Sequence, residues 1–171
     1  HFSWSSLGAT PPNLIVRGDL KKDQFLLRTQ IFFKNEGDFK FSDVAHDAKA
    51  ANYEFGWGVI FQDFTNRGLL DLVIAENYIG FPPHKILRLP GRFLMQAPDK
   101  TLVSVEKEIG VENPYYAISP LTADFNGNGY ADLAFTNLNG PLRVFLNKGG
   151  SNHFLKVEMK NEPQALGAKV V

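Results

Sequence analysis

The 171 residues have the length of a single domain, and their hydrophobic fraction of 44% is that of an ordinary globular protein. The 18 basic and 18 acidic residues cancel, so charge gives no reason to expect nucleic acid or an anionic membrane as a partner. The absence of cysteine excludes disulfides and thiol catalysis, and no apolar run reaches the roughly 20 residues of a membrane-spanning helix.

The composition predicts an all-β chain of short strands and tight turns, because it holds 15 Phe, 15 Gly and 10 Pro. Strands are expected at residues 13–16, 25–33, 39–41, 71–76, 93–96, 102–105, 117–123, 132–136, 142–147 and 153–159. An alanine-rich stretch at 43–51 is predicted to form a turn of helix. Lys148-Gly149-Gly150-Ser151 is the clearest boundary, and it divides the chain into residues 1–150 and 151–171.

Residues 124–132 have the spacing of a cation-binding loop. Side chains with oxygen ligands occupy loop positions 1, 3, 5 and 9, namely Asp124, Asn126, Asn128 and Asp132. Gly129 at position 6 permits a sharp turn, and Tyr130 at position 7 offers its backbone carbonyl. Hard cations such as Ca²⁺ prefer oxygens of these kinds.

The loop differs from an EF-hand in two ways. Position 12 is Phe135, where an EF-hand needs a bidentate Glu, and the flanking residues are typical of strands rather than helices. The competing interpretation is an Asn-Gly hairpin turn without a metal, since turns and calcium loops use the same residue types.

A second loop lies 61 residues earlier and indicates an internal repeat. Asp63 corresponds to Asp124, and Asp71 to Asp132. The same offset, without a gap, pairs further loop and apolar positions: Phe64 with Phe125, Gly68 with Gly129, Phe32 with Phe93, Phe41 with Leu102, Val44 with Val105 and Phe55 with Tyr116. A period of this size is typical of stacked or radial β-units.

These motifs resemble a known family. Gly56-Trp57-Gly58 followed by an acidic loop ending in Asp-Leu resembles the FG-GAP or VCBS repeats of integrin α-like β-propellers. Residues 136–147 are similar to the last such repeat in the cartilage acidic protein family. Residues 152–157 and 167–170 are similar to the opening of the ASPIC/UnbV module that follows that propeller. The resemblance covers residues 33–171 and implies a partial β-propeller of two to three four-stranded blades.

The resemblance implies one calcium loop, with Asp124, Asn126, Asn128 and Asp132 as side-chain ligands and the backbone carbonyl of Tyr130. Two carboxylates imply a modest affinity, in the extracellular range of about 10⁻⁴ to 10⁻³ M.

The loop at 63–71 departs from the pattern, with Thr65 and Arg67 at positions 3 and 5. Because arginine stays charged, we expect Arg67 to pair with Asp63 and Asp71 in place of the metal. This loop is therefore predicted to be vestigial and metal-free.

A propeller closes with about 4 to 8 blades, more than this length holds. We therefore expect either a longer parent protein or a protein partner or further subunits that complete the propeller. The resemblance implies an extracellular or periplasmic location.

Two functions stay open. The first is a non-enzymatic, calcium-stabilised propeller that presents loops for protein–protein interaction, adhesion or assembly. The second is a propeller domain of a polysaccharide-active lyase or hydrolase. The aromatic residues Phe55, Trp57, Tyr115 and Tyr116 are interpreted as blade core, with a carbohydrate surface as the alternative. The first is favoured because the sequence lacks an unexplained cluster of ionisable groups.

Overall fold

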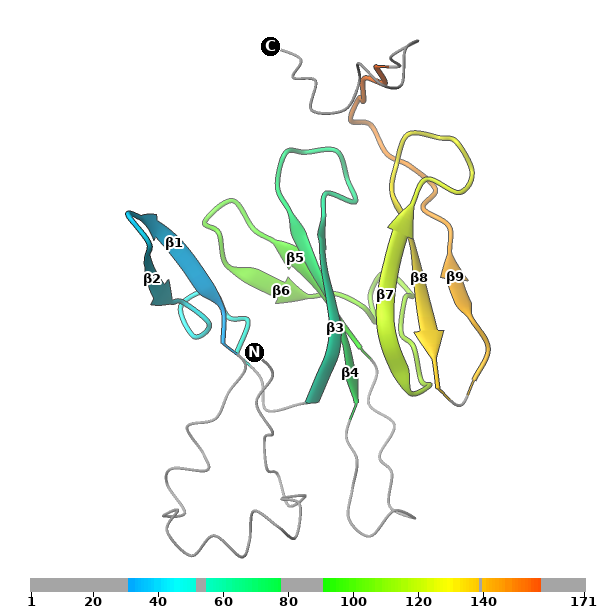
Figure 1. Cartoon of the computed structure of the whole chain (residues 1–171). Helices are drawn as coiled ribbons and strands as arrows, with labels where there is room; N and C mark the ends of the chain where they lie inside the picture. The colour runs from blue at the N-terminus through cyan, green and yellow to red at the C-terminus, as the bar shows by residue number, and fades with distance from the viewer. Residues whose placement is uncertain (1–30, 52–54, 78–90, 139, 158–171) are drawn as a thin grey trace, which may run out of the picture.

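The computed structural model describes residues 31–51, 55–77, 91–138 and 140–157, and these residues form an all-β structure without a helix. Figure 1 shows three antiparallel sheets side by side in chain order. Sheet 1 has the order β1-β2, sheet 2 the order β3-β4-β5-β6 and sheet 3 the order β7-β8-β9. The strands are β1 Phe33–Gly37, β2 Lys40–Asp43, β3 Phe55–Gln62, β4 Asp71–Asn77, β5 Arg92–Gln96, β6 Leu102–Ser104, β7 Ala117–Ala123, β8 Asp132–Asn137 and β9 Arg143–Phe145.

Most predicted strands in the described residues are confirmed, and two predicted elements are wrong. Residues 45–49 form a turn rather than a helix. Ala48 N donates to Val44 O with helical spacing, but Ala50 and Ala51 both donate to the carbonyl of Ala45, and Lys49 has a non-helical φ of +57°. Residues 153–157 are not a strand, because the chain leaves sheet 3 after β9 and crosses the neighbouring loops. The strands predicted at 13–16 and 25–30, and residues 158–171, lie outside the described residues.

The 61-residue repeat is present in the backbone. Val44 donates to Phe32 O at 2.8 Å, and Val105 donates to Phe93 O at 2.9 Å. The β3–β4 and β7–β8 pairs also share a register irregularity at the same repeat position, between Gly56 and Gly58 in one and between 117 and 119 in the other. The repeated sequence therefore produces the same local structure twice.

Strand β9 takes the place of β5 in the second copy. Arg92 and Arg143 hold the same position beside the preceding strand, but Arg92 follows its partner Ile74 by 18 residues and Arg143 follows its partner Phe135 by 8. This shorter connection breaks the 61-residue register, so β9 matches β5 in structure but not at the repeat offset. In the described residues, sheet 3 has no counterpart of β6.

The hydrophobic core lies between neighbouring sheets. Residues of sheets 2 and 3, together with Phe64 of the β3–β4 loop, form one cluster. It contains Phe64, Val73, Ala75, Phe93, Ala117, Leu133 and Phe135. A second cluster contains Leu72, Ile74, Leu94 and Leu102 of sheet 2 with Ala50 of the preceding turn, and Phe32 packs against it. Side chains alternate across a strand, so β4 and β5 of sheet 2 are buried on both faces, while Val59 and Phe61 of the edge strand β3 stay about half exposed.

Gly58 in β3 allows sheets 2 and 3 to approach closely. A Cβ atom at Gly58 would lie 2.7 Å from the carbonyl oxygen of Ile118 and 2.9 Å from Pro120 Cδ in β7. Both neighbours are held by the β7 backbone, so neither side can relax without separating the sheets.

Gly58→Ala is therefore expected to lower the free energy of unfolding by about 1–3 kcal/mol through overpacking. Urea denaturation measures the change, with Gly150→Ala as the control, because a Cβ there lies no closer than 3.6 Å to its neighbours. Equal stability of both variants would contradict the close approach.

Candidate metal centre

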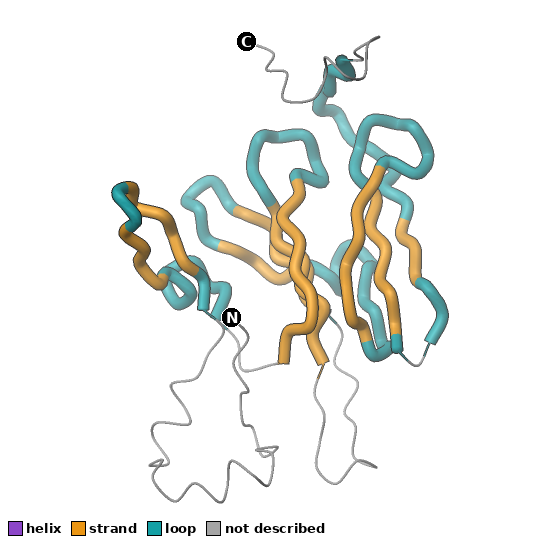
Figure 2. Tube along the Cα trace, viewed as in Figure 1, coloured by secondary structure: helices purple, strands orange, loops and turns teal. Residues whose placement is uncertain are grey.

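The two repeated loops lie at the same end of sheets 2 and 3 and contact each other (Figure 2). The first loop, residues 63–71, joins β3 to β4, and the second loop, residues 124–132, joins β7 to β8. Asn66 of the first loop donates from Nδ2 to the carbonyl of Gly129 in the second at 2.9 Å.

Both loops wrap around the carboxylate at their first position. Asp63 accepts from the backbone N–H of Arg67 at 3.2 Å and of Gly68 at 2.7 Å. Asp124 accepts from Asn128 at 3.0 Å and from Gly129 at 2.8 Å, the equivalent positions. Gly68 and Gly129 have φ of +78° and +83°, which glycine adopts without steric cost. The predicted loop geometry is thus the same in both copies.

The carboxylate that ends each loop is fully buried. Asp71 and Asp132 are each 0% exposed. Each carboxylate accepts one backbone N–H from outside its loop. Gln96 at the end of β5 donates to Asp71 Oδ1 at 3.0 Å, and Asn147, just beyond β9, donates to Asp132 Oδ1 at 2.6 Å. Burying a carboxylate costs free energy unless its charge is compensated, so both sites need a positive charge near the carboxylate.

In the first loop, Arg67 compensates the charge. Its Nη2 lies 2.6 Å from Asp71 Oδ1, which is the ion pair that the sequence predicts. The predicted second pairing takes another form, since Asp63 contacts Arg67 through the backbone N–H and not the guanidinium. Whether this loop is free of metal stays a prediction.

In the second loop, position 5 is Asn128, and Asp132 has no cationic partner among the described residues. Its carboxylate accepts only from the backbone N–H of Asn147 and from that of Phe125, the latter at 2.7 Å. Asn126 and Asn128 each use Oδ1 to accept one backbone N–H within the loop. The described residues contain no group of three or more His, Cys, Asp or Glu arranged for a metal, and this loop has two carboxylates. Carboxylate and amide oxygens beside an uncompensated buried charge fit a hard cation such as Ca²⁺.

Sequence reasoning missed two residues that hold the loops together. Asn147 donates from Nδ2 to the carbonyls of Phe64 in the first loop and Ala131 in the second, at 2.7 and 3.1 Å. Asn152 donates from Nδ2 to the carbonyl of Thr65 at 2.8 Å. A signal for Asn147 would have been its match to Gln96, but the shortened β8–β9 connection hides this match from a 61-residue comparison.

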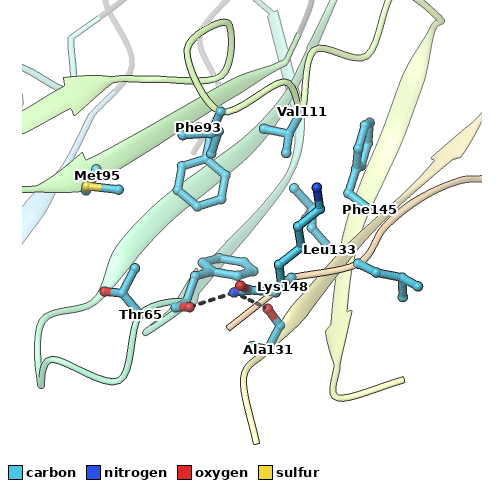
Figure 3. Close-up of a pocket in the computed structure, with 12 residues that line it drawn as sticks. Thr65, Phe93, Met95, Val111, Ala131, Leu133, Phe145 and Lys148 are labelled. Atoms are coloured by element: carbon cyan, nitrogen blue, oxygen red, sulfur yellow. Dashed lines mark hydrogen bonds between the residues drawn. The ribbon is translucent and has the colours of Figure 1, made fainter. Parts of the chain in front are cut away.

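A pocket of about 330 Å³ lies between sheets 2 and 3 beside these contacts (Figure 3). Its walls are mainly apolar, and Lys148 is its charged residue. The lining residues are Phe64, Thr65, Phe93, Met95, Ile109, Val111, Ala131, Leu133, Phe145, Leu146, Asn147 and Lys148. No carboxylate lines this pocket, so it does not supply the acid pair of a glycoside hydrolase.

The aromatic residues considered for a carbohydrate surface are mostly packed. Tyr116 is buried, its ring lies 5.9 Å from that of Trp57, and burial raises its pKa. Tyr115 lies under the guanidinium of Arg143 at 5.9 Å. The side chain of Phe55 lies outside the described part of the chain. These contacts support the interpretation of Tyr116 as a core residue. Trp57, on the edge strand β3, stays partly exposed.

Among the described residues, two carboxyl groups have lowered pKa values, both outside the loops. Hydrogen bonds from Lys34 and Ser42 lower the pKa of Glu36. The backbone N–H and hydroxyl of Thr101 lower the pKa of Asp99, which lines a second pocket between sheets 1 and 2. A lowered pKa is the opposite of what a general acid needs near neutral pH.

No family model matches the sequence, and no curated protein matches it significantly. The described residues contain no helix with the length and hydrophobicity to cross a bilayer.

Arg67→Met is expected to destabilise the chain by about 3 kcal/mol, because it leaves the charge of Asp71 buried without a partner. Urea denaturation measures the change. The double variant Arg67→Met/Asp71→Asn is expected to recover part of the loss, since the amide oxygen still accepts from Gln96 and carries no charge. An unchanged stability in Arg67→Met would show that Arg67 does not compensate Asp71.

Proposed function

We propose that this chain is a non-enzymatic, calcium-binding β-propeller segment that serves protein–protein interaction or assembly outside the cytoplasm. The observation that carries the proposal is the contrast between two equivalent buried carboxylates. Asp71 has the guanidinium of Arg67 at 2.6 Å, and Asp132 has only backbone N–H donors among the described residues. A cation bound at the second loop would compensate the charge of Asp132 as Arg67 compensates the charge of Asp71.

Calcium would be held by the side chains of Asp124, Asn126, Asn128 and Asp132 and by the backbone carbonyl of Tyr130. The ion would supply positive charge to two carboxylates at the junction of β7 and β8. The chain itself contributes the preformed loop, because Asp124 is already bonded to two backbone N–H groups. The role is structural: the ion joins the two strand ends and stiffens the loops beside them.

Calcium at 10 mM is expected to stabilise the chain by about 1.4–2.7 kcal/mol for a Kd between about 10⁻³ and 10⁻⁴ M. The melting temperature should rise by about 3–10 °C relative to a chelator. Asp124→Ala is expected to abolish this rise.

Asp63→Ala is the matched control. It removes the same kind of loop hydrogen bonds from the first loop, at Arg67 and Gly68, without touching the second. This variant should melt earlier than the wild type yet keep the calcium-dependent rise. If calcium leaves the melting temperature of the wild type unchanged, the second loop is only a turn and the metal proposal is overturned.

The propeller assignment and the need for a partner are supported by what covers each sheet. Leu94 in the middle sheet is 2% exposed, and its repeat counterpart Phe33 in sheet 1 is 56% exposed. Phe93 on the opposite face is 4% exposed, and Val144, at the matching position of sheet 3, is 48% exposed. Each outer sheet thus carries the apolar face that sheet 2 buries, and a neighbouring sheet would cover it.

The outer face of sheet 3 is the surface we propose for the partner. Leu121, Ala134 and Val144 form one row across its three strands. The equivalent row in sheet 2, Ile60, Val73 and Phe93, packs against sheet 3. The partner is therefore proposed to be another sheet of the same repeat type.

Val144→Lys is expected to weaken association of the purified chain through this face, because it places a charge on the exposed end of the apolar row, at β9. Sedimentation velocity over a range of concentrations measures the effect. Leu155→Lys is the control, since Leu155 is exposed and outside the sheets. A monomeric mass at every concentration, together with a cooperative melt of the wild type, would contradict the need for a partner.

The extracellular or periplasmic location is proposed from the expected affinity, since a site with two carboxylates fills at the millimolar calcium of those compartments. The alternative of a polysaccharide-active enzyme gains no support from the pockets described above. One contains no carboxylate. The other is lined by Asp47 and Asp99, and the pKa of Asp99 is lowered, not raised as a general acid requires.

A further inference from the structure

We propose that Asn147 is the positioning residue of the calcium site and couples this site to the first loop. The inference rests on the proposed function, because it concerns the geometry of the proposed ligands. Asn147 lies two residues beyond β9 and contributes no ligand itself. It contacts three of the four proposed ligand side chains, namely Asp132, Asn126 and Asn128.

The backbone of Asn147 orients these ligands. Its N–H donates to Asp132 Oδ1 at 2.6 Å, and its carbonyl accepts from Nδ2 of Asn126 at 3.3 Å and of Asn128 at 2.8 Å. A carbonyl oxygen can only accept, so both amides must turn their nitrogens toward it. Their Oδ1 atoms then face the loop, where they accept from the backbone N–H groups of Asn128 and Tyr130.

The side chain of Asn147 holds its backbone in this place. Nδ2 donates to Phe64 O at 2.7 Å and to Ala131 O at 3.1 Å, and Oδ1 accepts from Gly149 N at 3.0 Å. Figure 3 draws these two hydrogen bonds as dashed lines, one of which ends at the labelled Ala131. All backbone and side-chain polar groups of Asn147 are therefore engaged.

The first copy of the repeat has only part of this arrangement. Gln96 occupies the equivalent position and its N–H donates to Asp71 at 3.0 Å. Positions 3 and 5 of its loop are Thr65 and Arg67, which bring no amides for a carbonyl to orient. The carbonyl that orients two amides therefore occurs only in the second copy, where the buried carboxylate has no cationic partner among the described residues. We therefore assign this carbonyl to the metal site and not to the general fold of the hairpin.

The test compares Asn147→Ala with Asn152→Ala in the full chain, by calorimetric titration with calcium and by melting in chelator. Asn152→Ala is matched because it also removes a side-chain hydrogen bond to the first loop, at Thr65, and the Asn152 side chain contacts no proposed ligand. The backbone carbonyl of Asn152, which accepts from the Tyr130 hydroxyl, is kept in this variant. Both variants are expected to melt earlier than the wild type. Asn147→Ala should weaken calcium binding about 10-fold, as loss of a residue that orients metal ligands does, and Asn152→Ala should change it less than about 2-fold.

The outcomes separate the two proposals. If the wild type binds no calcium, the proposed function fails and this inference fails with it. If the wild type binds calcium and Asn147→Ala binds it equally well, only this inference is overturned. An equal loss in Asn152→Ala would also overturn it, because the effect would then be general loosening. If Asn147→Ala does not fold, Asn147→Ser provides the same comparison with a smaller change of side-chain polarity.

Discussion

The structure around both loops depends on one constraint, which is the placement of a carboxylate without solvent contact at the start of β4 and of β8. Asp71 and Asp132 are buried by the sheets that their own strands build, so their charge cannot be screened by water. Each needs hydrogen-bond donors and a positive charge. The first loop supplies that charge from within the chain through Arg67, and the second loop has the oxygen ligands with which to take it from solution.

One backbone donor to each of these carboxylates comes from the third strand of its sheet or from the residues just after it. Gln96 and Asn147 reach Asp71 and Asp132 from β5 and from just beyond β9, so each loop is complete only when its sheet has added that strand. This links loop formation to sheet formation. In the second copy the link extends further, because the side chain of Asn147 also bonds Phe64 in the neighbouring loop. Calcium at one loop would therefore stabilise the junction of two sheets.

The stacking of the sheets also favours further units beyond sheets 1 and 3. The inner strands of sheet 2 are covered on both faces, and apolar positions that they bury are exposed on sheets 1 and 3, as Phe33 and Val144 illustrate. A repeat whose unit buries its faces only against neighbours is stabilised by further units of the same kind. The second loop joins two strands of the sheet 3 face proposed for that unit, so a cation bound there would stiffen the strand ends beside this face.

The sequence alone determined the all-β class, the 61-residue repeat, the loop positions 63–71 and 124–132 and the pairing of Arg67 with Asp71, because periodicity and local spacing encode them. Only the tertiary structure decided the role of Asn147, which the shorter β8–β9 connection removes from the repeat register. It also decided that residues 153–157 cross the loops, although their alternating pattern predicts a strand. An alternating pattern shows that one face can be buried, and whether a strand partner is available depends on the rest of the chain.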